Sequence, residues 1–540
     1  MFDSDFSQVQ PVADRWRWNC ARRLARPAAL VCWLFALSGL ALLAGCGPDA
    51  AAPPGAHLPA PPAAFARRET WDAIYVQGKQ VGYAHLVDEP IVERGRTLLR
   101  STNELQLSAQ RFGDKSQLAF EIVSWEDAAG KLLRFETQSS LSKTPTSVTG
   151  YVEGDRLVFE TIAPGAGSPK SEPLRQTIPW SSEIGGFSAV EQSLRQAPLK
   201  AGERRTLRSL EPMINQVGMT ELSAREVEST ALPAGARRLL RVDRVTRFAG
   251  ATIPMTLWVD EAGEIWKTRT EAMQQESFRT TREAALRQGD GSLDLGLASV
   301  IHLAAPLPHA HQTREVRYLV EMTDGDPSRV FPTGPGQSLR PLGPHSAELT
   351  VRAIRPGNAA AAGPAAPSSD AEPTDAERRP NSLIQSDDSR VQELAREAVG
   401  DATDPWQVAT RLEAYVHRAV KNKNFSQALG SAAEVARSGE GDCTEHAVLL
   451  AAMARARGIP ARVALGLVYT EPAAMAFHMW TEMYIGGRWV PLDATLGRGG
   501  IGAAHLKIAQ SSLDGADQLA SFLPVAEALG QLKLQVLSSR

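Results

Sequence analysis

One stretch, residues 439–493, constrains this chain more than any other. It opens with Gly441-Asp442-Cys443-Thr444-Glu445-His446, runs on through the alanine- and leucine-rich segment 447–457 and stops at Gly458-Ile459-Pro460. An Asp before such a segment and a Gly-Pro stop after it predict a helix with Asp442 as N-cap and a buried face through Ala447, Leu450, Ala451 and Ala454. Cys443 then lies in the first turn, where the helix dipole and unpaired N–H groups favour a thiolate.

After this helix the pattern changes to the period-two alternation of β-strands. Segments 462–469, 477–485 and 488–493 predict three strands, and Gly486-Gly487 predicts a tight hairpin between the last two. His478 opens the second strand and Asp493 closes the third, so we expect both side chains near the same end of the sheet. A Cys at a helix start, a strand His and a neighbouring Asp supply a nucleophile, a base and a group that orients the base.

These motifs resemble the bacterial transglutaminase-like superfamily. The matching runs are Gly-Asp-Cys-Thr-Glu (441–445), Gly-Ile-Pro-Ala-Arg-Val (458–463), His-Met-Trp (478–480) and Trp-Val-Pro-Leu-Asp-Ala-Thr (489–495), within a resemblance that covers 387–496. The resemblance implies a papain-like core with a Cys-His-Asp triad. Cys443 would be the nucleophile, His478 the general base and acid, and Asp493 the residue that orients the imidazole. We expect the Cys443 backbone N–H to be one oxyanion donor and a residue within 424–427 to be the second.

A metal site is the main alternative for these residues. His446 lies three residues after Cys443 on the same helix face, and His478 would add a third ligand. No second Cys or close carboxylate pair completes a zinc set, so we expect no metal and no cofactor, and we interpret His446 as structural or as a support for the site.

Four further residues lie close in the sequence to the predicted triad residues. We interpret Glu445 and Glu482 as solvated surface charges rather than as groups that tune the site. We interpret Trp480 and Trp489 as walls of the cleft or of the core rather than as substrate platforms.

The first residues read as an export signal. Five arginines within 15–26 precede an apolar stretch, 28–44, which ends in Leu43-Ala44-Gly45-Cys46. This tetrapeptide resembles the bacterial lipoprotein box and predicts a signal peptide at 1–45, a lipidated Cys46 and an Ala/Pro-rich tether at 46–68. A plain transmembrane anchor is the alternative. By resemblance to Gram-negative lipoproteins, Gly47 in place of an Asp after the Cys implies the periplasmic face of the outer membrane.

Cysteine usage then gives Cys443 special weight. The chain has four cysteines, of which Cys20 and Cys32 would leave with the signal and Cys46 would be acylated. Cys443 would remain as a single thiol without a possible disulfide partner in the mature chain. Such a thiol in an exported protein is kept for chemistry or is buried away from oxidants.

The rest of the chain predicts an α+β protein of several domains. Segment 69–298 reads as a large, mostly antiparallel β domain, a curved sheet or half-barrel, with hairpin turns at 77–79, 153–155 and 261–263. A small β-rich segment at 299–355 and a linker at 356–380 precede the transglutaminase-like domain at 381–540. Helices are predicted at 389–399, 405–420 and 518–529, and a last strand at 532–537.

The expected function is that of an exported, membrane-anchored thiol enzyme. It would cleave or transfer amide bonds of protein or peptide substrates through a Cys thioester, with a protease or amidase favoured over a transglutaminase. The alternative is a catalytically silent binding or assembly module on the same fold. A net charge of −3 without a basic stripe argues against a nucleic-acid partner, whereas an unidentified partner on the β domain is possible.

Overall fold

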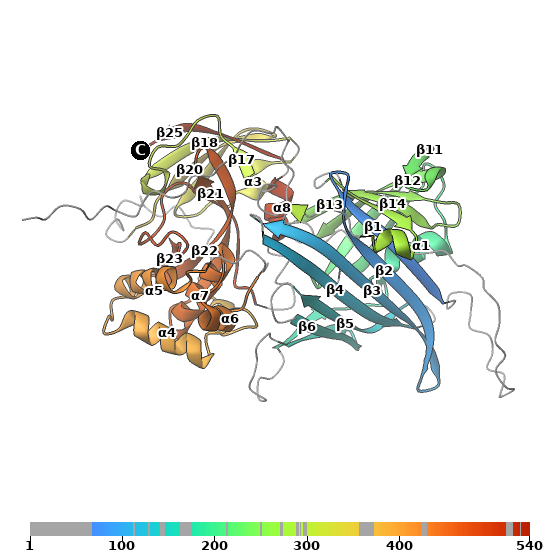
Figure 1. Cartoon of the computed structure of the whole chain (residues 1–540), viewed down its shortest axis with the longest axis horizontal. Helices are drawn as coiled ribbons and strands as arrows, with labels where there is room; N and C mark the ends of the chain where they lie inside the picture. Colours follow the sequence, from blue (N-terminus) through green and yellow to red (C-terminus); the bar gives the residue numbers. More distant parts are fainter. Residues whose placement is uncertain are drawn as a thin grey trace, which may run out of the picture.

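The computed structural model describes residues 67–540, except 112–113, 128–129, 141–145, 163–173, 212–213, 249–250, 271–273, 288–290, 292, 295–299, 324, 356–371, 423–428, 515–521 and 530. The predicted signal peptide, Cys46, the tether up to residue 66 and the expected oxyanion segment 424–427 therefore lie outside the described residues. The described chain is mostly β-structure, with a large antiparallel sheet first and a helix-rich part later (Figure 1).

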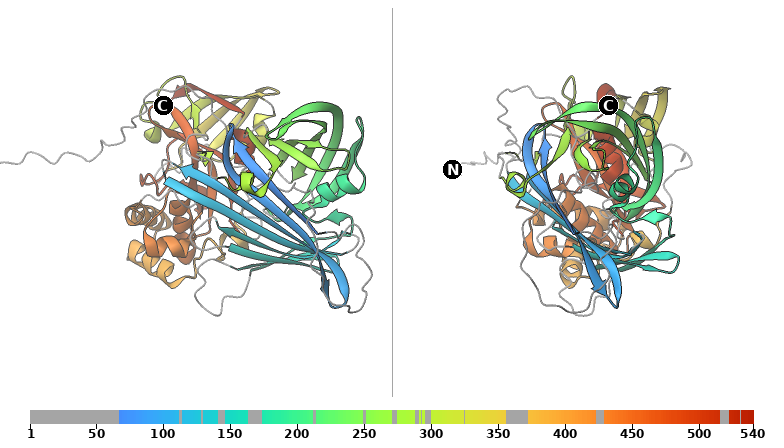
Figure 2. Two further views of the ribbon diagram at one scale, coloured as in Figure 1. Left: turned by 45° about the vertical axis from the view of Figure 1, so that its right-hand side comes forward. Right: turned by 90° about the vertical axis from the view of Figure 1, so that its right-hand side faces the viewer.

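The first part is a 16-stranded sheet in the order β8-β7-β6-β5-β4-β3-β2-β1-β15-β14-β13-β12-β11-β10-β9, with β16 beside β3. The sheet curls into an open half-barrel, as predicted (Figure 2). Its elements are β1 (Arg68–Val76), β2 (Lys79–Glu93), β3 (Arg96–Arg111), β4 (Asp114–Glu126), β5 (Leu132–Ser140), β6 (Thr146–Glu153), β7 (Arg156–Ile162), β8 (Leu174–Pro179), β9 (Ile184–Gly185), α1 (Ala189–Gln196), β10 (Arg204–Glu211), β11 (Gln216–Leu232), β12 (Gly235–Phe248), β13 (Ala251–Val259), β14 (Ile265–Thr270), β15 (Gln275–Thr280), α2 (Arg282–Ala285) and β16 (Leu293–Asp294).

Tight turns and one internal helix shape this sheet. At the β1–β2 hairpin both Gln77 and Gly78 have positive φ, the turn geometry that matches the right-handed twist of paired strands. Val190 and Leu194 of α1 are buried in one hydrophobic cluster with strands from both halves of the sheet. Helix α1 therefore contributes to the hydrophobic core of the large sheet.

The later part contains two smaller sheets and most of the helices. A five-stranded sheet has the order β17-β22-β21-β24 with β23 beside β22, and a four-stranded sheet has the order β19-β20-β18-β25. The elements are β17 (Val300–His302), β18 (Glu315–Met322), α3 (Pro327–Val330), β19 (Gln337–Gly343), β20 (Ser346–Arg352), α4 (Ser389–Val399), α5 (Pro405–Ala419), α6 (Ala432–Ser438), α7 (Cys443–Ala456), β21 (Ala461–Thr470), β22 (Ala474–Ile485), β23 (Arg488–Leu492), β24 (His505–Ser511), α8 (Leu523–Leu529) and β25 (Leu532–Ser539), with two short 3₁₀ turns at Ala310–Gln312 and Asp375–Glu377.

Segment 299–355 shares strands with the helical part instead of standing apart from it. Val300 to His302 of β17 pair with β22, and β18 pairs along its length with β25 at the end of the chain. One continuous hydrophobic cluster includes residues of β18, β20, α4, α5, α7 and the strands around them. Segment 299–355 and the helical part therefore fold around one core.

Helix α7 lies at the centre of this core. Helices α4, α5, α6 and α7 gather beside strands β21 to β23 (Figure 1). Every residue from Cys443 to Arg455 is buried, so the helix is covered on all sides and not only on the face expected from its sequence. The Thr481 hydroxyl donates to the Ala447 carbonyl at 2.9 Å and thereby ties β22 to the helix.

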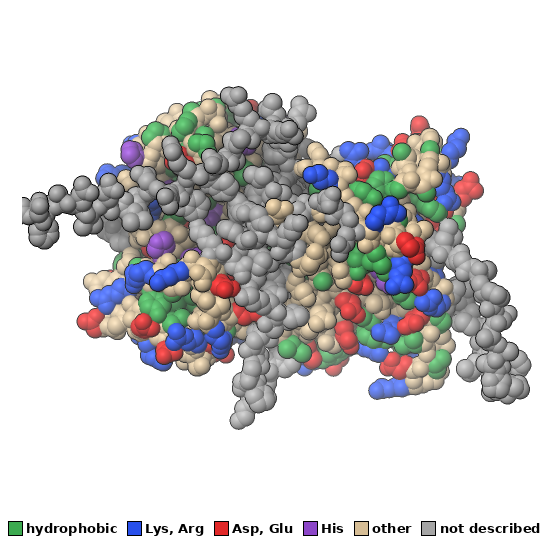
Figure 3. All heavy atoms as spheres, in the orientation of Figure 1, with side chains coloured by type: hydrophobic (Ala, Val, Ile, Leu, Met, Phe, Trp, Pro, Cys, Tyr) green, Lys and Arg blue, Asp and Glu red, His purple; other side chains and the backbone are tan. Residues whose placement is uncertain are grey.

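The surface is mixed in charge. On the face drawn in Figure 3, Lys and Arg side chains are interspersed with Asp and Glu over both the large sheet and the helices. Among the described residues, no helix combines the length and apolar character that crossing a bilayer requires.

Candidate active site

The start of helix α7 is fixed by a reciprocal cap. The Asp442 side chain accepts a hydrogen bond from the Thr444 N–H at 2.9 Å, and Glu445 accepts one from the Asp442 N–H, also at 2.9 Å. This is the capping box of a stable helix start. Gly441 has φ of +152°, and a Cβ there would lie 2.3 Å from the Glu445 Cβ, so this position requires glycine.

Strands β22 and β23 bring His478 and Asp493 together. In their antiparallel pairing Thr481 lies opposite Leu492, so Asp493 follows directly toward the end at which His478 lies. His478 is four residues inside β22, because the strand begins at Ala474 and not at residue 477. The side chains of His478 and Asp493 therefore lie together at one end of the hairpin, as expected from the sequence.

The three sequence-predicted residues lie in contact. Nε2 of His478 is 2.8 Å from Oδ2 of Asp493, and the thiol of Cys443 hydrogen-bonds the same imidazole. Because Asp493 occupies Nε2, Nδ1 is the nitrogen left for the thiol. His478 and Asp493 are buried, with 7% and 1% of their side chains exposed.

Burial and pairing set the charges in this group. Burial alone would lower the pKa of His478, but the Asp493 charge and hydrogen bond, together with the contact to Cys443, raise it to about 10. Burial would raise the pKa of Asp493, but the charge and hydrogen bond of His478, joined by a hydrogen bond from His505, hold it well below its usual range. The arrangement therefore favours an ionised Asp493 beside a protonated His478.

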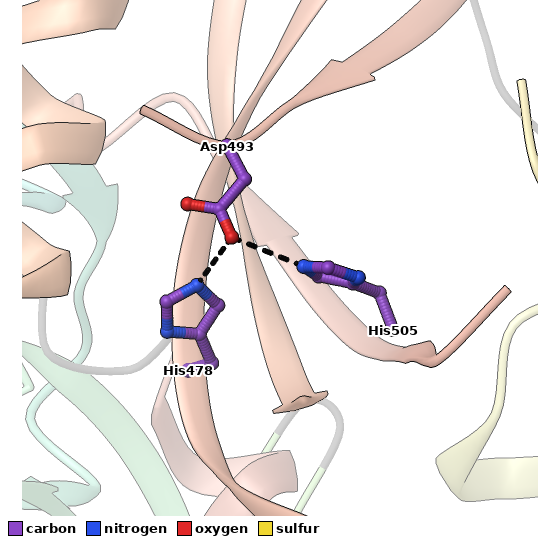
Figure 4. A group of neighbouring side chains, drawn as sticks. All are labelled: His478, Asp493 and His505. Atoms are coloured by element: carbon purple, nitrogen blue, oxygen red, sulfur yellow. Dashed lines mark hydrogen bonds and ion pairs between the residues drawn. The ribbon is translucent and has the colours of Figure 1, made fainter. Parts of the chain in front are cut away.

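His505, which the sequence analysis did not select, also contacts Asp493. Its Nε2 lies 3.1 Å from the same Oδ2 that receives His478, as Figure 4 shows. His505 is fully buried, and that burial lowers its pKa despite the nearby carboxylate. No local sequence signal marks this residue, because its position depends on the pairing of β24 with β21.

The same three side chains have the residue types of a metal site. The donor atoms of His478, Asp493 and His505 lie within 4.8 Å of one another. Around a tetrahedral zinc with bonds of about 2.0–2.1 Å, neighbouring donors are about 3.3 Å apart. The separations of 2.8 and 3.1 Å from Oδ2 are instead hydrogen-bond lengths, and we interpret both histidines as donors to one carboxylate oxygen.

Glu413 of α5 is a second residue that sequence reasoning missed. It is buried, and its carboxylate accepts hydrogen bonds from the backbone N–H groups of Asp493 at 3.2 Å and of Gly500 at 3.1 Å. Burial raises its pKa to about 7, and the Asp493 charge adds to the effect, although these backbone donors oppose it. Glu413 therefore anchors the loop that carries Asp493. The sequence signal that could have revealed Glu413 is the presence of a charged residue next to Leu412, in the apolar stripe of this helix.

The interpretation of Glu445 and Glu482 as solvated charges is wrong. Glu445 is buried under the helix cap, and burial, with the nearby Asp442 charge, raises its pKa to about 8. Glu482 is buried between two cations: Oε2 is 2.8 Å from Nε of Arg462, and Oε1 is 2.8 Å from Nζ of Lys507. Although burial opposes ionisation, these cations lower the pKa of Glu482. Both faces of the sheet are covered here, so alternation along the strand does not separate core from solvent.

The remaining site residues have structural contacts. Nδ1 of His446 lies 2.5 Å from the Asp442 carbonyl oxygen, so this nitrogen is directed at the helix cap and not at a shared ligand position with Cys443. Trp480 lies beside the His478 ring, with centroids 6.2 Å apart, and is edge-on to His505. Trp480 and Trp489 also line a cavity of about 60 Å³ between the five-stranded sheet and the 332–337 loop.

Comparison with known proteins identifies the family of this region. Residues 392–494 match the family model described as "Transglutaminase-like superfamily". The chain therefore carries a transglutaminase-like domain, which is the class of thiol-enzyme fold that the motifs predicted. No protein with a curated description matches the sequence significantly.

Several solved structures are weakly similar to this chain. A candidate cysteine protease of Cytophaga hutchinsonii is 17% identical, with 45% of this chain and 89% of that chain covered and a TM-score of 0.28. A DUF1089-family protein of Pseudomonas aeruginosa is 14% identical, with coverages of 33% and 86% and a TM-score of 0.18. A candidate exported protein with a YmcC-like fold from Bacteroides fragilis is 13% identical, with coverages of 39% and 92% and a TM-score of 0.17. At these TM-scores the likenesses support no inference about this chain.

Proposed function

We propose that this protein is a thiol enzyme that cleaves or transfers amide bonds of protein or peptide substrates through a thioester on Cys443. The observation that carries the proposal is the contact series Cys443–His478–Asp493 at the capped start of a buried helix. A papain-like core is the fold that this order of helix and strands supports best, and the family match to the transglutaminase-like superfamily agrees with it.

The proposed reaction follows from which nitrogen of His478 faces which partner. The Cys443 thiolate attacks the amide carbonyl, and the tetrahedral intermediate collapses to a thioester while Nδ1–H of the imidazolium protonates the leaving amine. The neutral imidazole then takes a proton from water or from an incoming amine, which attacks the thioester and releases Cys443 as the thiolate. Asp493 holds Nε2–H throughout and so keeps Nδ1 directed at the sulfur.

Hydrolysis is the favoured outcome over amine transfer. An exported enzyme works in an aqueous compartment in which water is the abundant acceptor. Incubation of a casein-type substrate with a fluorescent amine, followed in parallel for amine incorporation and peptide release, distinguishes the two reactions. We expect release without incorporation, and incorporation without release would show a transglutaminase instead.

The proposal predicts a large effect of a single atom change. Cys443→Ser should lower peptide release by about 10³-fold or more, because a Ser hydroxyl in this pocket is a much weaker nucleophile than a thiolate. Thermal unfolding should be nearly unchanged, since the two side chains are of similar size. Equal activity of the two proteins would locate the chemistry elsewhere and leave the domain as a binding module.

We further propose that the enzyme is held by lipid on Cys46 at the periplasmic face of the outer membrane. Metabolic labelling with a fatty-acid analogue should mark the parent protein but not a Cys46→Ala variant, and the variant should leave the membrane fraction. Labelling retained in Cys46→Ala would contradict lipidation at this residue, and membrane retention without label would favour a transmembrane anchor.

A further inference from the structure

His505 is placed beside the proposed triad by the sheet. Strand β24 pairs with β21 so that Lys507 lies opposite Gly466, and His478 lies opposite the same glycine on β22. Directly opposed residues point to one face of a sheet, and residues two apart on a strand share that face. His505 and His478 therefore project to the same side, and their ring centroids are 5.9 Å apart.

The two histidines share one oxygen atom of Asp493. His478 approaches Oδ2 at 2.8 Å and His505 approaches it at 3.1 Å, while Oδ1 accepts the Thr495 N–H at 2.9 Å. A neutral imidazole has one N–H, and an ionised carboxylate only accepts, so the contact with Oδ2 requires the proton of His505 on Nε2. Both rings are then donors that converge on the carboxylate (Figure 4).

We propose that His505 is a positioning residue of the active site, which holds Asp493 Oδ2 in line with His478 Nε2 by donating a hydrogen bond to it. This inference rests on the proposed function, because it assigns a role within the same thiolate–imidazolium pair. His505 contacts Asp493 directly and lies beside the His478 ring. It acts on Cys443 through Asp493 and His478, and its contribution is the direction and charge of one oxygen.

The alternative role of His505 is packing. The ring is fully buried, lies edge-on to Trp480 at 5.3 Å between centroids, and lies 6.1 Å from the His311 ring. A packing role and a hydrogen-bonding role predict opposite rankings of two substitutions. His505→Phe keeps an aromatic ring but removes the N–H, whereas His505→Gln loses the ring but can place an amide N–H near the position of Nε2.

The test uses iodoacetamide on the full chain, with modification at Cys443 followed by mass spectrometry of its peptide between pH 5 and pH 10. The parent protein should react rapidly below pH 7. His505→Phe should react about 10- to 100-fold more slowly there, the range for loss of a hydrogen bond to a charged group. His505→Gln should remain within about threefold of the parent, and thermal unfolding of each variant reports its folding.

The outcomes separate the two proposals. Slow reaction of the parent with the pH profile of an ordinary thiol would overturn the proposed function itself. If the parent reacts rapidly, two results would overturn only the role of His505. One is an equal reaction rate in the two variants, and the other is a faster reaction of His505→Phe than of His505→Gln. If His505→Phe does not fold, a Gln variant that folds but reacts as slowly as Asp493→Asn also overturns it.

Discussion

Buried carboxyl groups occur in both halves of the molecule, and their pKa values differ according to the partners of each group. In the large sheet, burial raises the pKa of Glu191 on α1 to about 7, although Arg244 lies close enough to oppose the effect. In the transglutaminase-like domain Asp493 is as deeply buried, and two histidines hold its pKa well below the usual range. Burial favours the neutral acid at both positions, and at Asp493 the charge and hydrogen bond of His478, with the hydrogen bond of His505, outweigh it.

Removal of the Asp493 charge is the strongest test of this comparison between Glu191 and Asp493. In Asp493→Asn the pKa of His478 should fall well below its present value of about 10, because the negative charge that raises it is gone while the burial that lowers it remains. Peptide release should drop by about 10²- to 10⁴-fold, and the alkaline limb of the activity profile should move from near pH 10 toward neutrality. Initial rates between pH 5 and pH 10.5 provide the measurement.

The matched control for this change is Asp401→Asn, which alters an exposed carboxylate paired with Arg411. We expect the control to retain the parent's profile. An unchanged alkaline limb in Asp493→Asn would mean that His478 does not depend on this carboxylate for its charge.

The two cations that contact buried Glu482 allow a test of whether such pairing also contributes to stability. Arg462→Met removes one of the two ion pairs of Glu482 and keeps the pair with Lys507, and breaking a buried pair in this way should lower the free energy of unfolding by about 3 kcal/mol. Urea denaturation measures the loss. Arg390→Met, which breaks an exposed pair with Glu393, should cost less than about 1 kcal/mol. Equal losses in the two proteins would argue against any special contribution of the buried site.

Glu191 offers the smallest and most specific test. Its folded pKa of about 7 lies above the ordinary 4.5, so the folded state holds the proton more tightly than the unfolded state. The parent should therefore lose stability as the pH rises from about 4.5 to about 7, and this loss should persist above that range. Glu191→Gln removes the titration and should be more stable than the parent by about 2 kcal/mol at pH 8, but nearly equal at pH 5.

Urea denaturation of both proteins at the two pH values measures this effect. Glu261→Gln, at an exposed turn, should show no such pH dependence. A stability difference for Glu191→Gln that is the same at both pH values would contradict a buried, titrating Glu191.

The parts of the structure that the sequence predicted well are those in which neighbouring residues determine the outcome. Asp442 caps α7 as predicted because the cap needs only residues within one turn, and Pro405 begins α5 for the same reason. The half-barrel and its hairpins followed from local alternation and turn residues. The helix bounds 389–399 agree with α4 at both ends.

The parts that the sequence did not predict depend on contacts between distant segments. His505 meets Asp493 only because β24 lies beside β21, and no pattern around residue 505 specifies that neighbour. Glu482 seemed a surface charge on an alternating strand, but the strands β19–β20 and the 332–337 loop border its face. A buried charge of this kind is recognised only when its partners, here Arg462 and Lys507, are known.

The pairing of β17 with β22 and of β25 with β18 determines where the chain can be divided. A fragment that starts at residue 381 would keep the proposed triad but lose β17 to β20, and it would expose the backbone edges of β22 and β25. Unpaired edges recruit strands from other molecules, so such a fragment should aggregate even though it contains the entire matched family region. The smallest autonomously folding unit that holds the proposed triad is therefore expected to begin before residue 300 and to extend through Ser539.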